Sequence, residues 1–366
     1  MSILGQATTF GTDNYRKHQN CADTHFREYN QLLMSSIGIG TYLGRVDEET
    51  DRLMLQAVVD AIANGINVVD TAINYRHQRS ERVVGQAIHQ VINQGIANRE
   101  GLVICTKGGF VPHPNRVEWF KATYVDPPET SISMADLAQQ RHCMHPDYIR
   151  DQLNRSLENL GVETIDIYYL HNPEEQLSHV SPEIFYKQLE ASFIVLEEAV
   201  AAGKIGAYGL ATWSAFRVTP NHKAHIDLAK AQAIAQSVSP QGESHFKFIQ
   251  LPLNLLMLEG ATLATQTIDG CQMPALQAAE QLNIAPVASA AIAQGKELEQ
   301  MLPLLTSNSK ERLAIGQQAL QFTRSIPGLS TALVGMKQPE HVAENLELVP
   351  LPILQQTAVE SLLNRW

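Results

Sequence analysis

The sequence predicts an α/β protein built as a (β/α)8 TIM barrel, with a long loop after the third strand and a short C-terminal helix. Short apolar runs typical of buried strands alternate with amphipathic helical segments eight times along the chain. Glycine and proline signals fall at the ends of these segments and not at a linker, so we expect one domain over residues 1–366. A doubly wound sheet is the alternative architecture.

The expected elements follow from the spacing of apolar residues and from the residues that begin or end helices. We expect an arm or hairpin over 1–35, the barrel over 36–348 and a C-terminal helix over 349–366. The strands are expected at 36–41, 66–70, 102–107, 164–171, 205–211, 246–252, 285–289 and 330–335. The helices are expected at 48–64, 80–94, 146–160, 182–202, 223–236, 273–282 and 309–324 (with Ser309 as N-cap), and from Pro339.

Composition excludes several classes of function. The formal net charge is −11, so the chain has no basic footprint for nucleic acid or anionic lipid. No apolar run approaches the roughly 18 residues of a membrane span. The four cysteines form no CxxC pair, and Cys105 is expected to be a small buried hydrophobic residue, so we expect no metal site and a cytoplasmic location. The oligomeric state stays open.

Polar residues end three successive predicted strands. Asp70, Lys107 and His171 each directly follow a short apolar run, and Tyr75 lies five residues beyond Asp70. Neighbouring strands of a barrel lie roughly 4.8 Å apart, and functional groups gather at their C-terminal ends. Each residue alone fits a structural role, as a cap, a rim residue, a solvated strand end or a turn. Together, in this order, the four predict a site.

The order of elements and residues resembles the aldo-keto reductase family over about residues 38–345. Each matching motif is weak alone, but the set is specific because all occur in order at strand ends. The motifs are Gly38-Ile39-Gly40-Thr41-Tyr42, Asp70-Thr71-Ala72 with Tyr75, Ser80-Glu81 and Gly85, then Lys107, Leu170-His171-Asn172-Pro173, Gly335-Met336-Lys337, Pro339-Glu340-His341 and Glu344-Asn345. The resemblance implies reduction of aldehydes and ketones with NADPH.

Carbonyl reduction needs a proton donor that is protonated at neutral pH yet acidic enough to react. We interpret Tyr75 as this general acid, with Lys107 stabilising its phenolate and lowering its pKa from about 10. Asp70 would hold Lys107, and His171 would orient the carbonyl oxygen. The family uses the same four roles, and all four residues match.

A cofactor site is expected at two turns. The stretch from Gly38 to Gly44 has the pattern G-x-G-x-x-x-G, which is not the dinucleotide fingerprint, so a tight turn is favoured. By resemblance, its residues Gly40, Thr41 and Tyr42 would lie beside the nicotinamide ribose.

The second turn follows the last strand, where Gly335 and Lys337 precede a helix that starts at Pro339. A helix N-terminus and a lysine suit the 2′-phosphate of NADP(H). By resemblance, Glu344 and Asn345 would reach the adenine; an exposed helix surface is the alternative.

Several positions depart from the family pattern. Thr212 replaces the usual Asn that holds the carboxamide, whereas Gln250 matches its other partner. Ser289 follows Ala288 where the family often stacks an aromatic ring on the nicotinamide. His341 stands where an arginine often meets the 2′-phosphate. These changes leave the preference for NADP over NAD open.

The long loop over 108–145 leaves the third strand beside the predicted site. Its aromatic residues Trp119, Phe120 and Tyr124 would either wall a substrate pocket or pin the loop to the barrel as a small separate core.

The sequence therefore predicts an NADP(H)-dependent oxidoreductase that acts on a small carbonyl substrate. One alternative is a Schiff-base lyase using Lys107, which a paired Asp70 disfavours because it keeps the amine charged. Another is a non-catalytic NADP(H)-binding barrel that senses redox state.

Overall fold

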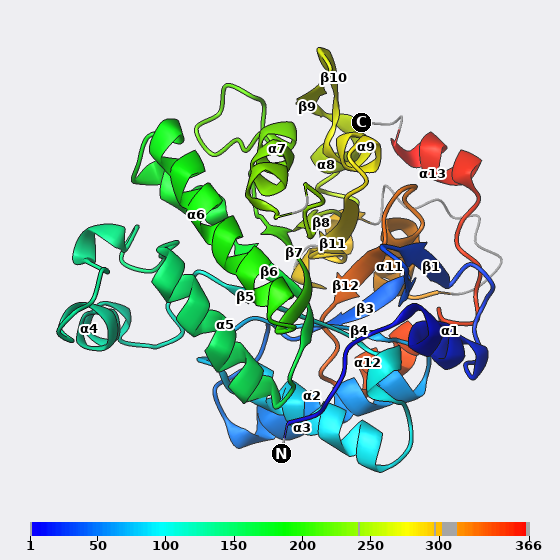
Figure 1. Ribbon diagram of the computed structural model, residues 1–366. Helices are drawn as coiled ribbons and strands as arrows, with labels where there is room; N and C mark the ends of the chain where they lie inside the picture. The colour runs from blue at the N-terminus through cyan, green and yellow to red at the C-terminus, as the bar shows by residue number, and fades with distance from the viewer. Residues whose placement is uncertain (1, 241, 296–297, 302–312, 364–366) are drawn as a thin grey trace.

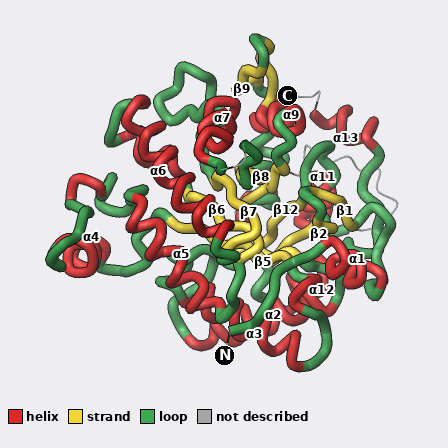
Figure 2. Tube along the Cα trace, in the orientation of Figure 1, coloured by secondary structure: helices red, strands yellow, loops and turns green. Residues whose placement is uncertain are grey.

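The fold is a closed parallel barrel surrounded by helices (Figures 1 and 2). The computed structural model describes residues 2–240, 242–295, 298–301 and 313–363. Within this part of the chain, eight parallel strands close in the ring order β11–β12–β3–β4–β5–β6–β7–β8, which confirms the predicted fold class. They are β3 (Ile37–Gly40), β4 (Val68–Asp70), β5 (Val103–Gly108), β6 (Ile165–His171), β7 (Ile205–Ala211), β8 (Phe246–Pro252), β11 (Ala285–Ser289) and β12 (Thr331–Val334).

Helices follow the strands and cover the outside of the barrel. Asp47 and Ser181 cap two of them by accepting hydrogen bonds from backbone N–H groups, and Gly161 ends a third in the left-handed conformation at φ 63°. The main helices are α2 (Glu48–Ala63), α3 (Arg79–Asn93), α5 (Pro146–Leu160), α6 (Pro182–Ala201), α7 (Leu228–Val238), α9 (Ala275–Gln281), α11 (Ile315–Arg324), α12 (Pro339–Leu346) and α13 (Gln356–Leu363).

Some boundaries differ from those expected. Helix α7 begins five residues late, because Asp227 caps it. Helix α9 begins after residue 274, because Cys271–Pro274 forms strand β10 and pairs with β9 (Ala264–Ile268) as an antiparallel hairpin. The predicted N-cap Ser309 lies outside the described residues.

The N-terminal segment contains more structure than an arm. Helix α1 (Thr9–Lys17) precedes the hairpin of β1 (Phe26–Tyr29) and β2 (Leu32–Ser35), and Thr8 caps the helix. Three short helices also lie between the main elements: α4 (Arg116–Phe120), α8 (Glu259–Thr262) and α10 (Leu298–Met301).

The core has two parts because side chains alternate along each strand. Outward residues such as Val69 and Ile104 pack against the helices, whereas inward residues such as Val68 and Val103 fill the barrel. Cys105 is among the inward residues and is buried, as expected for a small hydrophobic side chain. The interior of the barrel is therefore filled by this packed core up to the C-terminal ends of the strands, where the inward-facing residues are polar.

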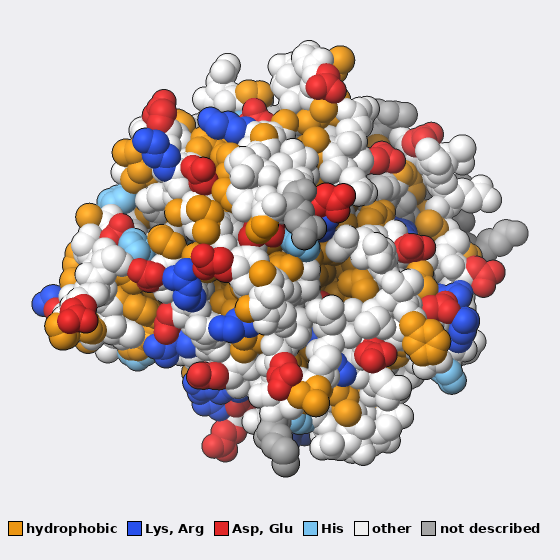
Figure 3. All heavy atoms as spheres, in the orientation of Figure 1, with side chains coloured by type: hydrophobic (Ala, Val, Ile, Leu, Met, Phe, Trp, Pro, Cys, Tyr) orange, Lys and Arg blue, Asp and Glu red, His pale blue; other side chains and the backbone are white. Residues whose placement is uncertain are grey.

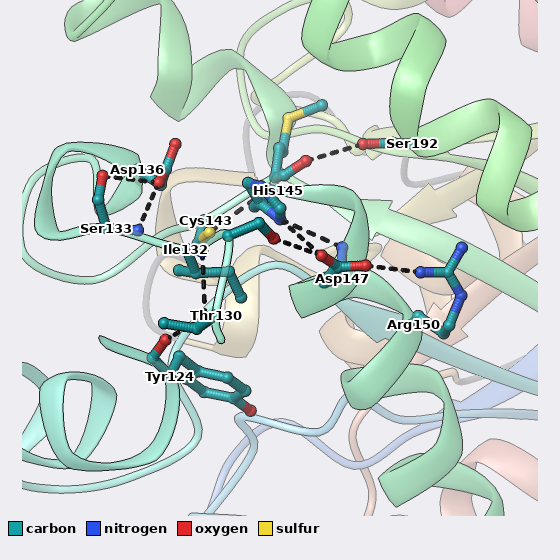
Figure 4. Close-up of polar contacts among 12 residues, drawn as sticks. Tyr124, Thr130, Ile132, Ser133, Asp136, Cys143, His145, Asp147, Arg150 and Ser192 are labelled. Atoms are coloured by element: carbon teal, nitrogen blue, oxygen red, sulfur yellow. Dashed lines mark hydrogen bonds and ion pairs between the residues drawn. The ribbon is translucent and has the colours of Figure 1, made fainter. Parts of the chain in front are cut away.

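The long loop after β5 is fastened to the outside of the barrel rather than left free (Figure 4). Thr130 donates from its hydroxyl to the Tyr124 carbonyl at 2.7 Å, and the Ser131 hydroxyl donates to Asp147 at the start of α5 at 2.5 Å. The Ser192 hydroxyl of α6 donates to the Met144 carbonyl at 3.1 Å. The first bond braces the loop internally, and the other two fix its far end to α5 and α6.

The face of the molecule drawn in Figure 3 is not strongly basic. In Figure 3, acidic and basic side chains are interspersed over the face shown. Among the described helices, none combines the length and apolar character required to cross a membrane. The cytoplasmic location stays a prediction.

Two buried histidines are expected to make the fold sensitive to acid. Burial lowers the pKa of both His25 and His142 to about 4. Between roughly pH 6.5 and pH 4, the unfolded chain therefore binds protons that the folded chain does not. The free energy of unfolding should be highest above this window and should fall with decreasing pH, by up to about 3 kcal/mol per histidine. Urea denaturation at several pH values measures this slope.

The control is His25→Gln, which cannot take up the proton. The His25 ring lies 3.0 Å from the Gly65 carbonyl and 3.1 Å from the Ser36 hydroxyl, and an amide can replace part of these bonds. The variant should show a shallower dependence on pH than the parent. An unchanged slope would contradict the assignment.

Candidate active site

Alternation along four barrel strands directs the predicted residues toward the mouth of the barrel. The inner core contains Val68, Cys105, Tyr169 and Phe248. The residues two positions further along these strands are Asp70, Lys107, His171 and Gln250. Because the side-chain period of a strand is two, these residues face the same side as the inner core, one layer higher. The fold thus gathers them at the C-terminal ends.

Lys107 is the centre of the polar contacts at this layer. Its side chain is 0% exposed, and its Nζ donates to Asp70 Oδ1 at 2.5 Å and to the Thr71 carbonyl at 2.8 Å. The second oxygen of Asp70 accepts from Gln250 Nε2 at 2.9 Å. The Lys107 Nζ also lies 3.5 Å from the Tyr75 hydroxyl. The amine therefore links the buried carboxylate to the phenol.

The protonation of this group follows from burial and from the short distances. Burial alone lowers the pKa of an amine, but Asp70 and Tyr75 reverse this and raise the pKa of Lys107 above its usual value. Burial raises the pKa of Tyr75, and the Lys107 ammonium opposes the rise by stabilising the phenolate. The predicted lowering of the Tyr75 pKa is wrong in its net direction, because burial outweighs Lys107. The phenol is protonated at neutral pH.

A left-handed turn sets the direction of Tyr75. The three residues that follow it, Arg76, His77 and Gln78, all have positive φ, at 50°, 55° and 72°. Such backbone costs of order 1–3 kcal/mol per residue and needs support from its surroundings. Arg76 supplies that support, because its buried guanidinium donates to Asp51 at 2.6 Å and to two backbone carbonyls of the β3–α2 loop.

His171 lies beside Tyr75, and other residues hold its backbone in place. The two rings meet edge to face with centroids 5.7 Å apart, and the Phe110 ring also packs edge to face on the imidazole at 5.0 Å. His142 Nε2 donates to the His171 backbone carbonyl at 2.8 Å, and Gln176 donates to His142 Nδ1 at 2.8 Å. His142 and Gln176 therefore fix the strand end that carries the imidazole.

The imidazole of His171 is neutral. Burial lowers its pKa well below the usual value, and the charge of Lys107 adds to this effect. Its Nδ1 is buried without a hydrogen-bond partner among the described residues. A neutral imidazole can donate from one ring nitrogen and accept at the other.

A cavity of about 620 Å³ opens above these residues. Tyr75 and His171 line it at the barrel axis, and Lys337 lines it on the side of β12. This volume lies within the range of roughly 300–1,000 Å³ that is usual for ligand sites. The cavity thus has Tyr75 and His171 in its lining together with the cation Lys337.

Most residues predicted to hold a cofactor line this cavity, and two do not. Glu344 is exposed on α12, and Asn345 is buried with its amide 3.8 Å from the sulfur of Met336. Gln250 and Thr212 both line the cavity, but Gln250 donates to Asp70, and the Thr212 hydroxyl lies 3.4 Å from the Gln250 carbonyl. The lining residues among those predicted are Gly40, Thr41, Tyr42, Asp70, Thr212, Gln250, Ser289, Gly335, Lys337 and His341.

The sequence did not predict several cavity-lining residues that come from loops. Trp213 lines the cavity with 45% of its surface exposed, and its backbone N–H donates to Glu174 at 2.7 Å. The loop after β11 also lines the cavity, and its Ala290 and Gln294 have positive φ at 52° and 58°. Alanine gives no sequence signal for such backbone, so only the position of this loop after a strand could have indicated it.

The aromatic residues of the long loop pack into the hydrophobic core outside the barrel and so pin the loop there. Trp119 and Phe120 pack against Tyr124, which packs against Tyr148 of α5 at 4.9 Å. None of the three predicted aromatic residues is among the described residues that line the cavity. The same loop lines the cavity through Phe110, Arg116 and Arg141.

In the part of the chain that the structure describes, no group of three or more His, Cys, Asp or Glu side chains is arranged to hold a metal ion.

Comparison with known proteins identifies the family. The model of the Aldo/keto reductase family matches residues 36–364, which is most of the chain. The chain belongs to the aldo/keto reductase family. This confirms the resemblance seen in the sequence.

Relatives within the family carry different names. A putative voltage-gated potassium channel subunit beta from Schizosaccharomyces pombe is 27% identical over 350 residues, covering 90% of this chain and 91% of the relative. An NADH-specific methylglyoxal reductase from Escherichia coli is 29% identical over 191 residues, about half (49%) of each chain. Membership of the family therefore leaves open which nicotinamide cofactor an individual member uses.

A solved structure agrees with the fold. An aldo/keto reductase from Klebsiella pneumoniae, in complex with NADP and acetate, superposes with a TM-score of 0.61 at 19% identity, covering 95% of both chains. At this identity the likeness concerns the barrel architecture alone.

Asp70 and Lys107 are expected to be strongly coupled in their contributions to the free energy of unfolding. Asp70→Asn leaves the buried ammonium without its charge partner, and Lys107→Met leaves the carboxylate alone, so each should reduce the free energy of unfolding by about 3–5 kcal/mol. The double variant should be more stable than the sum of the two losses, because no unpaired charge remains. Urea denaturation of the parent, the two single variants and the double variant measures the four free energies of this double-mutant cycle. Strict additivity would show that the two charges do not interact.

Proposed function

We propose that this member of the aldo/keto reductase family reduces aldehydes or ketones to alcohols, with NADPH as the hydride donor. The observation that supports it most directly is the contact chain from Asp70 through Lys107 to the Tyr75 hydroxyl, with Tyr75 facing the cavity. A phenol placed next to a buried ammonium is a suitable proton donor to a carbonyl oxygen.

The proton step uses groups of the chain itself. The Tyr75 O–H bond breaks and a new O–H bond forms on the substrate oxygen, while the electron pair left on Tyr75 is stabilised by Lys107. Because Asp70 keeps Lys107 charged, this stabilisation is in place before the proton moves. The bound nicotinamide would supply the hydride that reaches the carbonyl carbon at the same time.

His171 suits the role of a neutral hydrogen-bond donor. Its depressed pKa keeps the imidazole uncharged, and its ring stands edge to face against Tyr75. A donor from each of the two rings can therefore meet one carbonyl oxygen. His142 and Gln176 act as positioning residues, since they hold the backbone of His171.

The cavity suits a dinucleotide phosphate. It reaches from Tyr75 to Lys337 and His341, both of which line it. Helix α12 begins at Pro339, so its N-terminal N–H groups lie close to Lys337 and His341. Lys337 and His341 would hold the 2′-phosphate. One relative is named as NADH-specific, so the preference of this chain for NADPH over NADH has to be measured directly.

A second function also has support. The relative that matches 90% of this chain is named as a channel subunit, which describes an assembly rather than a reaction. A barrel that binds NADP(H) and reports its redox state to a partner is therefore the second candidate. A Schiff-base lyase is disfavoured, because the Asp70 contact keeps Lys107 charged.

Removal of the Tyr75 hydroxyl tests the proposed reaction. Tyr75→Phe should lower kcat by about 10²–10⁴-fold with a panel of aldehydes, because it removes the proton donor. Its dissociation constant for NADPH should stay close to that of the parent. NADPH absorbance and fluorescence titration measure the two quantities.

The matched control is Tyr29→Phe. The Tyr29 hydroxyl donates to the Gly328 carbonyl at 2.8 Å, beside the starts of β8 and β11 and away from the cavity. This variant should keep the parental rate. Equal rates for Tyr75→Phe and the parent would reject Tyr75 as the acid, whereas tight NADPH binding without turnover in the parent would favour the binding role.

Removal of the Lys337 charge tests the cofactor preference. Lys337→Ala should raise KM for NADPH on the order of tenfold and leave KM for NADH nearly unchanged, because only NADPH carries the phosphate that Lys337 would meet. The exposed Lys223 serves as control, since Lys223→Ala removes the same charge elsewhere. An equal effect of Lys337→Ala on both cofactors would contradict the assignment.

A further inference from the structure

The two guanidinium groups that line the cavity differ in their partners. Arg116, the first residue of α4, lines the cavity and makes no ion pair with any carboxylate among the described residues. Arg141 also lines the cavity, but both oxygens of Glu175 accept from it, at 3.0 and 2.8 Å. Arg141 and Glu175 therefore cancel, and Arg116 contributes an uncompensated positive charge.

Arg116 reaches the cavity from the loop that follows β5. It belongs to the same loop as Phe110, whose ring packs on His171 at 5.0 Å. Lys337, the cation suited to the cofactor phosphate, follows β12, which is three strands around the ring from β5. The two cations therefore approach the reacting centre from different sectors of the barrel.

Two histidines lie near Arg116, one of them in the same loop. His113 lies in the same loop and stacks on Trp119 with centroids 5.8 Å apart, which orders the segment just before Arg116. Burial lowers the pKa of His77, and His113 and Arg116 lower it further, so the three groups lie within electrostatic reach of one another. Arg116 is therefore the charged group of this set, in a chain whose net charge is −11.

We propose that Arg116 binds a carboxylate on the substrate, so that the preferred substrates are aldehydes or ketones that carry a carboxylate away from the reacting carbon. This inference rests on the proposed carbonyl reduction. A guanidinium presents paired N–H donors that match the two oxygens of a carboxylate. One uncompensated positive charge balances one carboxylate, whereas a phosphate would bring close to two negative charges.

Two aldehydes of the same length test the proposal. Succinic semialdehyde and butanal differ in having a carboxylate or a methyl group at the far end. The parent should show kcat/KM on the order of tenfold higher for the carboxylate-bearing aldehyde. Arg116→Gln should lose this preference while its kcat/KM for butanal stays parental, and raised ionic strength should reduce the preference of the parent.

The charge-matched control is Arg82→Gln. Arg82 lies on α3 outside the cavity, where its Nε donates to Asn159 at 3.1 Å. This variant should keep the preference. A parent without preference, or an Arg116→Gln protein that retains it, would overturn the subsite while leaving carbonyl reduction intact.

A binding measurement separates failure of the subsite from failure of the proposed reaction. Calorimetric titration with succinate, which cannot be reduced, should give a dissociation constant on the order of tenfold weaker for Arg116→Gln than for the parent and for Arg82→Gln. Equal binding by all three proteins would overturn the subsite. If no variant reduces either aldehyde but the succinate difference holds, the reaction fails and the anion subsite stands.

Discussion

The buried contact between Lys107 and Asp70 constrains the rest of the site. An ammonium that is 0% exposed loses its hydration, and only a close carboxylate and further acceptors offset that loss. Asp70 and the Thr71 carbonyl supply these acceptors, and Gln250 satisfies the remaining carboxylate oxygen. Three strands must therefore end at the same height in the barrel. The parallel register that pairs Asp70 with Cys105 and Lys107 with Tyr169 provides this alignment.

The phenol depends on a different kind of support. Tyr75 lies in a loop, so no strand register fixes it, and three left-handed residues follow it. Arg76 ties this strained turn to Asp51 and to the β3–α2 loop, which itself lines the cavity through Tyr42. The ring of Tyr42 in turn packs edge to face on Tyr75 at 4.9 Å. Two loops that flank the cavity are thus coupled through one buried guanidinium.

The sequence predicts the barrel well because strand and helix periods are local properties. The expected strands 205–211, 246–252 and 285–289 coincide with β7, β8 and β11. Helix α1 and the β9–β10 hairpin were not predicted, because they bury mainly small or polar residues such as Thr12, Thr265 and Gln266 and so lack a clear apolar pattern. Likewise, the charges beside Tyr75 can be inferred from the residues, whereas its burial depends on tertiary packing. That burial decides the net direction of its pKa.

The distribution of charge divides the cavity into a neutral centre and positive ends. At the centre, Asp70 cancels Lys107, and both Tyr75 and His171 are uncharged at neutral pH. Toward the rim, Lys337 and Arg116 line the cavity without a carboxylate partner in the described part of the chain. A neutral centre favours proton transfer between uncharged groups, because no fixed charge there opposes the change. In the proposed reaction, charges on a bound molecule are then best held at the two ends, away from the carbonyl group.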